Sequence, residues 1–164
     1  MTTDIYRSQH AQLMLLLMQL DGLPGPLSDN AAKARRILAD LEGRLAAHCA
    51  SEGSLLYPRL LSCSNSATRA LAESFESEMD RMEQEFRRFA RRWLLDGAIE
   101  TYPTDFIRET HAITTPLIER IRRENAQLLP LADQLTGRLR LSEPRPLRFS
   151  RGVLLSTLIL ASSA

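Results

Sequence analysis

The sequence of 164 residues is short of the features that mark several common classes of protein. Its glycines and prolines form no Gly-rich phosphate loop, and no run of alternating Val, Ile and Thr predicts a β-strand. Neither sign of charge is in excess, because 21 Lys and Arg residues stand against 20 Asp and Glu residues. The sequence therefore gives no electrostatic reason to expect binding to nucleic acid or to an anionic membrane.

Cysteine is also scarce, and the start of the chain lacks a targeting pattern. Cys49 and Cys63 do not have metal-finger spacing, and Met1 is not followed by the basic and then apolar layout of a signal peptide. We expect two free thiols and a reducing, cytoplasmic location. The apolar run at 152–161 is too short for an integral membrane span, which takes about 20 residues.

Leu, Ala, Arg and Glu are abundant, and the apolar residues recur at the helical period. Their stripes predict four long helices, at about 2–20, 30–61, 67–95 and 104–128, separated by segments rich in turn formers. We therefore predict an all-α fold, an antiparallel up-down four-helix bundle. The bundle is expected to fill residues 1–136, and 137–164 form a C-terminal tail whose structure the sequence does not specify.

A histidine and a carboxylate interrupt the apolar stripe of the second predicted helix. The stripe steps by three and four residues through Leu38, Leu41, Leu45, His48, Glu52 and Leu55. An ionised Glu in such a position costs on the order of several kcal/mol unless it is paired or binds a metal. His48 lies one turn before Glu52, so the two side chains can hold one cation from one side. The adjacent Gly53 is interpreted as leaving room for a ligand or for a neighbouring backbone.

The other predicted helices carry further candidates. The first helix has His10 in an apolar stripe, and its apolar surface is wide enough that we expect it to be deeply buried; a lone histidine there is more often a satisfied core residue. The fourth helix has Glu124 in its stripe, with Arg120 one turn earlier. Glu78 flanks the stripe of the third helix, where an ion-paired carboxylate and a metal ligand are both open. His111 lies far round its helix and is left out of the site.

Two segments carry a resemblance to a known family. The segments HCASEGSLLYPRL and LIERIRRENAQLLPLAD, together with the order of His and Glu along the helices, resemble the hemerythrin-like HHE cation-binding domains over about residues 5–133. The resemblance implies an antiparallel bundle around two irons bridged by carboxylates of helices 2 and 4. One iron takes His from helices 1 and 2, and the other takes three His from helices 3 and 4.

Carried over to this chain, the resemblance implies that the first iron and the bridging positions are served by His10, His48, Glu52 and Glu124. The second iron site departs from the family pattern. The third helix offers Glu78 and Met82 in place of two His, and Arg120 stands where the fourth helix should carry His. Arg cannot ligate a metal, so we expect one ion at most, with Arg120 paired to Glu78 or Glu124.

Two imidazoles and one or two carboxylates suit a non-haem ferrous ion, with zinc or manganese as alternatives. We interpret the chain as a binding or sensing module for iron, oxygen, nitric oxide or peroxide. Two alternatives stay open: an oxygen or peroxide enzyme that uses His10, His48 and Glu52, and a metal-free structural or partner-binding bundle. No substrate pocket can be read from the sequence, so an enzyme has the least support. A small diatomic ligand and a homodimer are also left open.

Overall fold

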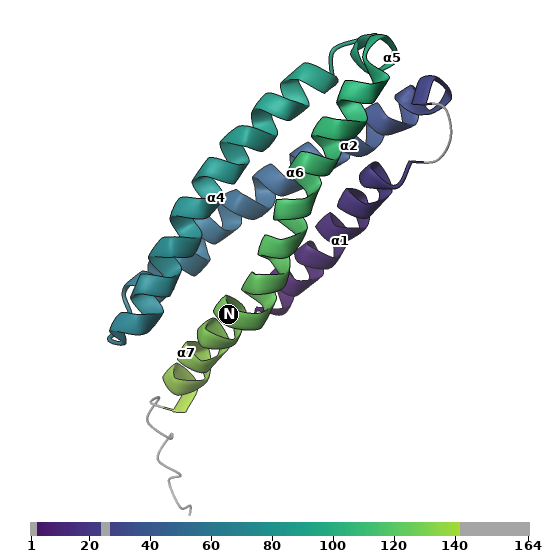
Figure 1. The fold of residues 1–164 in the computed structure, drawn as a ribbon. Helices are drawn as coiled ribbons and strands as arrows, with labels where there is room; N and C mark the ends of the chain where they lie inside the picture. Colours follow the sequence, from purple (N-terminus) through teal and green to yellow (C-terminus); the bar gives the residue numbers. More distant parts are fainter. Residues whose placement is uncertain (1–2, 24–26, 142–164) are drawn as a thin grey trace, which may run out of the picture.

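Four long helices lie side by side in the computed structural model, which describes residues 3–23 and 27–141 (Figure 1). Each runs opposite to the one before it. α1 packs against α2 and α6, and α4 also packs against both of these helices. Every element in the described ranges is helical, which confirms the predicted all-α antiparallel bundle. The four helices are α1 (Asp4–Asp21), α2 (Leu27–Ser51), α4 (Ser66–Trp93) and α6 (Pro103–Arg123).

Two of the four helices continue through a π turn into a further α-helix. α2 leads into η1 (Glu52–Leu56) and then α3 (Tyr57–Leu61). α6 leads into η2 (Glu124–Leu128) and then α7 (Leu129–Leu141). The last stretch thus runs past the predicted helix end at 128 and past the expected domain boundary at 136. The rest of the expected tail, 142–164, lies outside the described residues. A short helix, α5 (Ala98–Thr101), connects α4 to α6.

Each π turn is followed closely by a proline. Proline lacks an N–H, and its ring crowds the carbonyl four residues earlier, so a helix has to open in the preceding turn. Here the opened turn closes five residues back, because the N–H of Tyr57 donates to the carbonyl of Glu52 and that of Leu129 to the carbonyl of Glu124. Pro58 and Pro130 are thus the sequence features that explain where the π turns occur.

The π turn of η1 changes which side chains face the core. A turn that holds an extra residue rotates the side chains after Glu52 relative to an α-helix. Leu55 is 50% exposed, whereas Leu56 and Tyr57 are buried. The prediction that Leu55 continues the buried stripe is therefore wrong, because the α-helical period was extended through a wider turn.

The helix α1 is buried along one stripe only. The predicted stripe of Tyr6, His10, Leu13, Leu17 and Leu20 is buried throughout. On the opposite side, Leu15 is 58% and Met18 is 61% exposed. The expectation of a deeply buried helix is wrong, because a helix of a four-helix bundle packs on its neighbours and leaves its outer side to solvent.

Two clusters of buried apolar side chains fill the bundle. On α1, His10 lies between Tyr6, which belongs to the smaller cluster, and Leu13, which belongs to the larger one. The start of α1 is also tied to α7, since the hydroxyl of Thr3 donates to Asp133 Oδ1 at 2.6 Å. The apolar clusters therefore enclose a polar layer at the level of His10.

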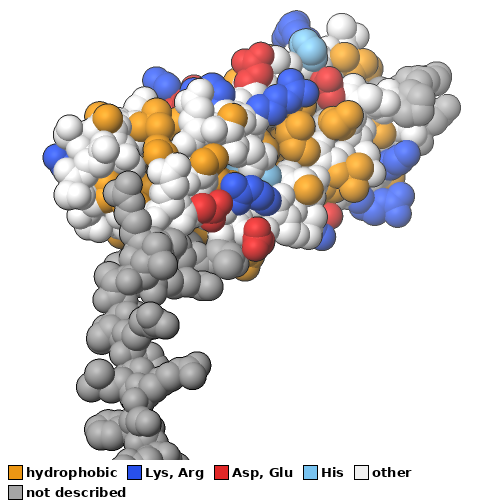
Figure 2. Space-filling model, turned by 90° about the horizontal axis from the view of Figure 1, so that it is seen from below, with side chains coloured by type: hydrophobic (Ala, Val, Ile, Leu, Met, Phe, Trp, Pro, Cys, Tyr) orange, Lys and Arg blue, Asp and Glu red, His pale blue; other side chains and the backbone are white. Residues whose placement is uncertain are grey.

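The surface carries both signs of charge. Figure 2 shows acidic and basic side chains close together on one face, with apolar side chains between them. Cys49 and Cys63 are free thiols, and burial raises the pKa of Cys49 to about 12. Among the helices of the described ranges, none has the length and apolar character needed to cross a membrane.

Candidate metal centre

The four predicted ligands meet in the polar layer of the bundle. His10 comes from α1 and His48 from α2, whereas Glu52 and Glu124 begin the π turns η1 and η2. One ligand atom from each residue lies within 4.8 Å of the others, and all four residues are at most 1% exposed. Residues far apart in the sequence thus form one buried cluster of nitrogen and oxygen donors.

The two imidazoles point the same kind of atom at each other. His10 Nε2 lies 3.1 Å from His48 Nε2. The opposite ring nitrogens contact amide oxygens: His10 Nδ1 lies 2.8 Å from Asn125 Oδ1, and His48 Nδ1 lies 2.9 Å from Gln9 Oε1. An amide oxygen only accepts, so each Nδ1 carries the proton and each Nε2 presents a lone pair. Two lone pairs at this distance repel each other unless a proton or a metal ion lies between or beside them.

The carboxylates supply oxygen atoms next to the same point. Glu52 Oε1 lies 3.4 Å from His48 Nε2, and Glu124 Oε2 lies 3.4 Å from His10 Nε2. Both oxygens of Glu52 and Oε2 of Glu124 are buried without a hydrogen-bond partner. Buried carboxylate oxygens without partners are costly, and a metal ion among these atoms would satisfy them together with both imidazoles. The residues present therefore fit a metal ion.

Burial shifts the protonation of the cluster. Desolvation, reinforced by the charge of Glu124, raises the pKa of Glu52 to about 9. Desolvation and the neighbouring His10 lower the pKa of His48 to about 4. Both side chains are then neutral near pH 7 in the metal-free protein. Because a metal ion binds the carboxylate, ion binding has to displace the proton from Glu52.

Arg120 lies beside this cluster and is completely buried. Its Nη2 donates to Glu124 Oε1 at 2.6 Å and to the Tyr57 hydroxyl at 2.8 Å, and its Nη1 donates to Glu78 Oε2 at 3.2 Å. Desolvation opposes ionisation of Glu124, but the neighbouring His10 and the charge of Arg120 together lower its pKa. Arg120 thus contacts both Glu78 and Glu124, the two carboxylates that the sequence analysis gave as its alternative partners.

Glu78 faces arginines rather than the four clustered ligands. Besides Arg120, it accepts from Arg123 Nη2 at 2.5 Å. This contact corresponds to the ion-paired interpretation of Glu78, which the sequence had left open beside a metal-ligating one. His111, excluded on helical geometry, is exposed at the surface 3.3 Å from Asp21.

Three residues of the site were not found from the sequence: Gln9, Asn125 and Tyr57. Gln9 and Asn125 are the sequence neighbours of His10 and Glu124, and an amide beside a candidate ligand was the available signal. Tyr57 is turned inward by η1, for which the signal was Pro58. The interpretation that Gly53 leaves room for a neighbouring backbone is wrong, because a Cβ added there would have no protein atom within 4 Å.

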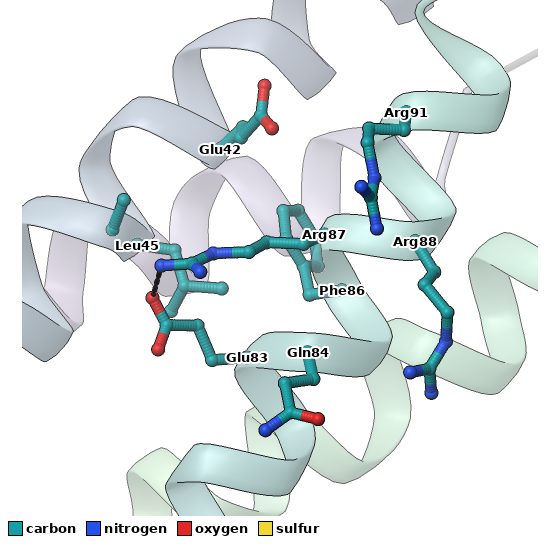
Figure 3. A pocket seen from close by; sticks show the side chains of 9 residues that line it. Glu42, Leu45, Glu83, Gln84, Phe86, Arg87, Arg88 and Arg91 are labelled. Atoms are coloured by element: carbon teal, nitrogen blue, oxygen red, sulfur yellow. Dashed lines mark hydrogen bonds and ion pairs between the residues drawn. The ribbon is translucent and has the colours of Figure 1, made fainter.

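A separate groove of about 370 Å³ runs between α2 and α4. Figure 3 shows that Arg87 extends toward Glu83, one turn earlier on the same helix, with which it pairs at 2.6 Å, while Arg88 and Arg91 lie farther along α4. Nearby, Arg92 pairs with Glu109. Arg87, Arg88, Arg91 and Arg92 thus belong to a charged outer face that includes acidic partners, and the groove has no residue in common with the metal-ligand cluster.

Fold and site together define a helical bundle with a buried His and Glu cluster that fits a metal ion. The model of the hemerythrin HHE cation binding domain matches residues 1–132. The match covers most of the chain, which therefore belongs to this family, as the resemblance implied. No curated protein and no solved structure matched the chain. The family and the cluster support a metal-binding domain without identifying the metal.

Proposed function

We propose that this protein binds non-haem iron through His10, His48, Glu52 and Glu124 and serves as a sensor or binding module. The observation that carries the proposal is the pair of Nε2 atoms 3.1 Å apart, each with its other ring nitrogen bonded to an amide oxygen. Two imidazole nitrogens with carboxylate oxygens form a donor set that suits ferrous iron, although zinc and manganese accept it as well.

The burial of the cluster favours a small ligand. The four residues are at most 1% exposed, so a molecule the size of oxygen or nitric oxide has easier access than a larger substrate. The cluster also joins α1 to both π turns, so that a change at the metal reaches three parts of the bundle. These two features support sensing over catalysis. We further propose a cytoplasmic location, where reducing conditions keep the thiols free.

The first test is the metal content of protein purified anaerobically without added metal. We expect bound iron in the unmodified protein and a large loss of it in His48→Ala, because this change removes one ligand nitrogen. His111→Ala is the matched control, since His111 is exposed and outside the cluster. Elemental analysis of all three proteins provides the measurement. If His48→Ala retains its iron, the proposed ligand set is wrong; if the unmodified protein binds no metal, the metal-free structural alternative is favoured.

A second experiment separates a sensor from an enzyme. Iron-loaded protein is mixed with oxygen, nitric oxide or hydrogen peroxide while its absorption spectrum is followed. We expect a spectral change that saturates at a fixed ratio of ligand to iron. Continued consumption of peroxide or oxygen over many equivalents would instead support the enzyme alternative.

A further inference from the structure

The two oxygens of Glu124 have different surroundings. Its Oε2 faces the imidazoles, 3.4 Å from His10 Nε2, and lacks a hydrogen-bond partner. Its Oε1 faces the other way and accepts from Arg120 at 2.6 Å and from the Tyr57 hydroxyl at 3.1 Å. Glu124 therefore has one oxygen free for a metal ion and one that is already in use.

The guanidinium of Arg120 occupies the space between two carboxylates. It donates to Glu124 on one side and to Glu78 on the other, and its central carbon lies 5.2 Å from the ring centre of Phe75. This arginine is fully buried, so it cannot turn toward solvent without opening the bundle. A guanidinium is always charged and has no lone pair for a metal. It therefore fills the place that a second cation would need.

We infer that Arg120 is a built-in cation that limits the centre to one metal ion and positions Glu124 to offer it a single oxygen. This inference rests on the proposed function, because it counts ions in the proposed centre. Charge supports the same count. The carboxylates of Glu52, Glu124 and Glu78 together balance Arg120 and one divalent ion, and the half-exposed Arg123, which pairs with Glu78, adds a further positive charge. A second divalent ion would leave excess positive charge in a buried layer.

Titration of the metal-free protein with Mn²⁺, in a buffer without other metal ions, tests the inference directly. The unmodified protein should bind one ion and show the paramagnetic resonance signal of an isolated Mn²⁺. Arg120→His removes the fixed charge and adds a ligand nitrogen beside Glu124, and it should bind two ions whose signals are coupled. The matched control is Arg123→His, which makes the same change at a half-exposed arginine whose recorded ion pair is with Glu78, and it should bind one ion.

Each outcome of the titration separates the inference from the proposed function. Two ions in the unmodified protein would overturn the inference and leave the proposed metal centre standing. No ion would contradict both. A folded Arg120→His protein that binds one ion would also overturn the inference. Arg120→Lys is measured alongside as the variant that retains the charge: one ion supports the inference, and two ions contradict it even if Arg120→His does not fold.

Discussion

Glu52 and His48 are both neutral near pH 7 for the same physical reason, although their ionised forms carry opposite charges. Burial disfavours any ionised group, so it raises the pKa of the Glu52 carboxyl to about 9 and lowers that of the His48 imidazole to about 4. In each case the neighbouring like charge, from Glu124 or from His10, adds to the effect of burial. The metal-free site is therefore adapted to low charge, and an arriving cation changes its protonation.

These shifts predict how the stability of the metal-free protein depends on pH. Above about pH 4.3, folded Glu52 retains a proton that the unfolded chain releases, so the free energy of unfolding falls as pH rises toward 9. His48 acts in the opposite direction between about pH 4 and 6.5, where only the unfolded chain binds the extra proton. The two effects offset each other below pH 6.5. Above it, stability should fall by up to about 1.4 kcal/mol per pH unit.

Urea unfolding in the presence of a chelator, repeated from pH 6.5 to 9, measures this dependence. Glu52→Gln is the control, because an amide of similar shape has no proton to lose, and its stability should stay nearly constant over the same range. If the unmodified protein and Glu52→Gln have parallel profiles, Glu52 is not the group responsible.

At the scale of elements, both candidate ligand carboxylates belong to the first residue of a π turn. The carbonyl of Glu52 accepts from Tyr57, and that of Glu124 accepts from Leu129. The wider turn brings the side chain five residues after the ligand onto the buried side, and in η1 this side chain is Tyr57, which donates to Glu124. The π turn at one carboxylate thus supplies a hydrogen bond to the other.

Replacement of the proline after η1 tests this dependence. Pro58→Ala restores the missing N–H and removes the crowding ring, so we expect the turn to revert to α-helix and Tyr57 to move away from Glu124. Metal affinity should then fall by roughly tenfold to a hundredfold, as is usual when groups that orient a metal ligand are lost. Competition with a chelator of known affinity measures the change. Pro116→Ala, in an exposed position inside α6, should leave the affinity unaltered, and an unaltered affinity in Pro58→Ala would contradict the role of the turn.

Much of the fold and the clustering of the four candidate ligands could be predicted because most of each long helix keeps the α-helical period. The stripe on α1 that includes His10 is an example, since no π turn interrupts α1. Prediction failed where a property depends on tertiary structure or on an irregular turn. The position of Leu55 depends on η1, and the partners of the two imidazoles depend on which amides arrive from other helices. The contacts of Arg120 with Glu78 and Glu124 could be anticipated because a buried guanidinium has to pair with carboxylates near it.

At the scale of the whole molecule, the proposed ion is a crosslink. Its four ligands come from α1, α2 and the two π turns, and these elements converge only in the folded state. A ligand that binds only the folded state stabilises it, by about 4 kcal/mol when free metal is a thousandfold above the dissociation constant. The metal-loaded bundle should therefore be more stable than the metal-free bundle, which is held together by its apolar clusters alone.

Removal of the metal should lower the melting temperature. For a domain of this size we expect a loss of about 10 °C when a chelator is added to loaded protein. Scanning calorimetry with and without chelator measures it, and His48→Ala serves as control because it should melt at the same temperature in both. A loaded protein that melts at one temperature regardless of chelator would show that the ion does not link the helices.

The histidines are oriented by residues from other elements, and each such residue adjoins a ligand. Gln9, next to His10, fixes the ring of His48, whereas Asn125, next to Glu124, fixes the ring of His10. The consequence concerns transplantation of the site into another bundle. Four ligands copied alone would arrive with free-turning imidazoles, so the smallest unit that can be grafted includes the dipeptides Gln9-His10 and Glu124-Asn125. A designer who changes Gln9 or Asn125 alters the orientation of a ligand on a different helix.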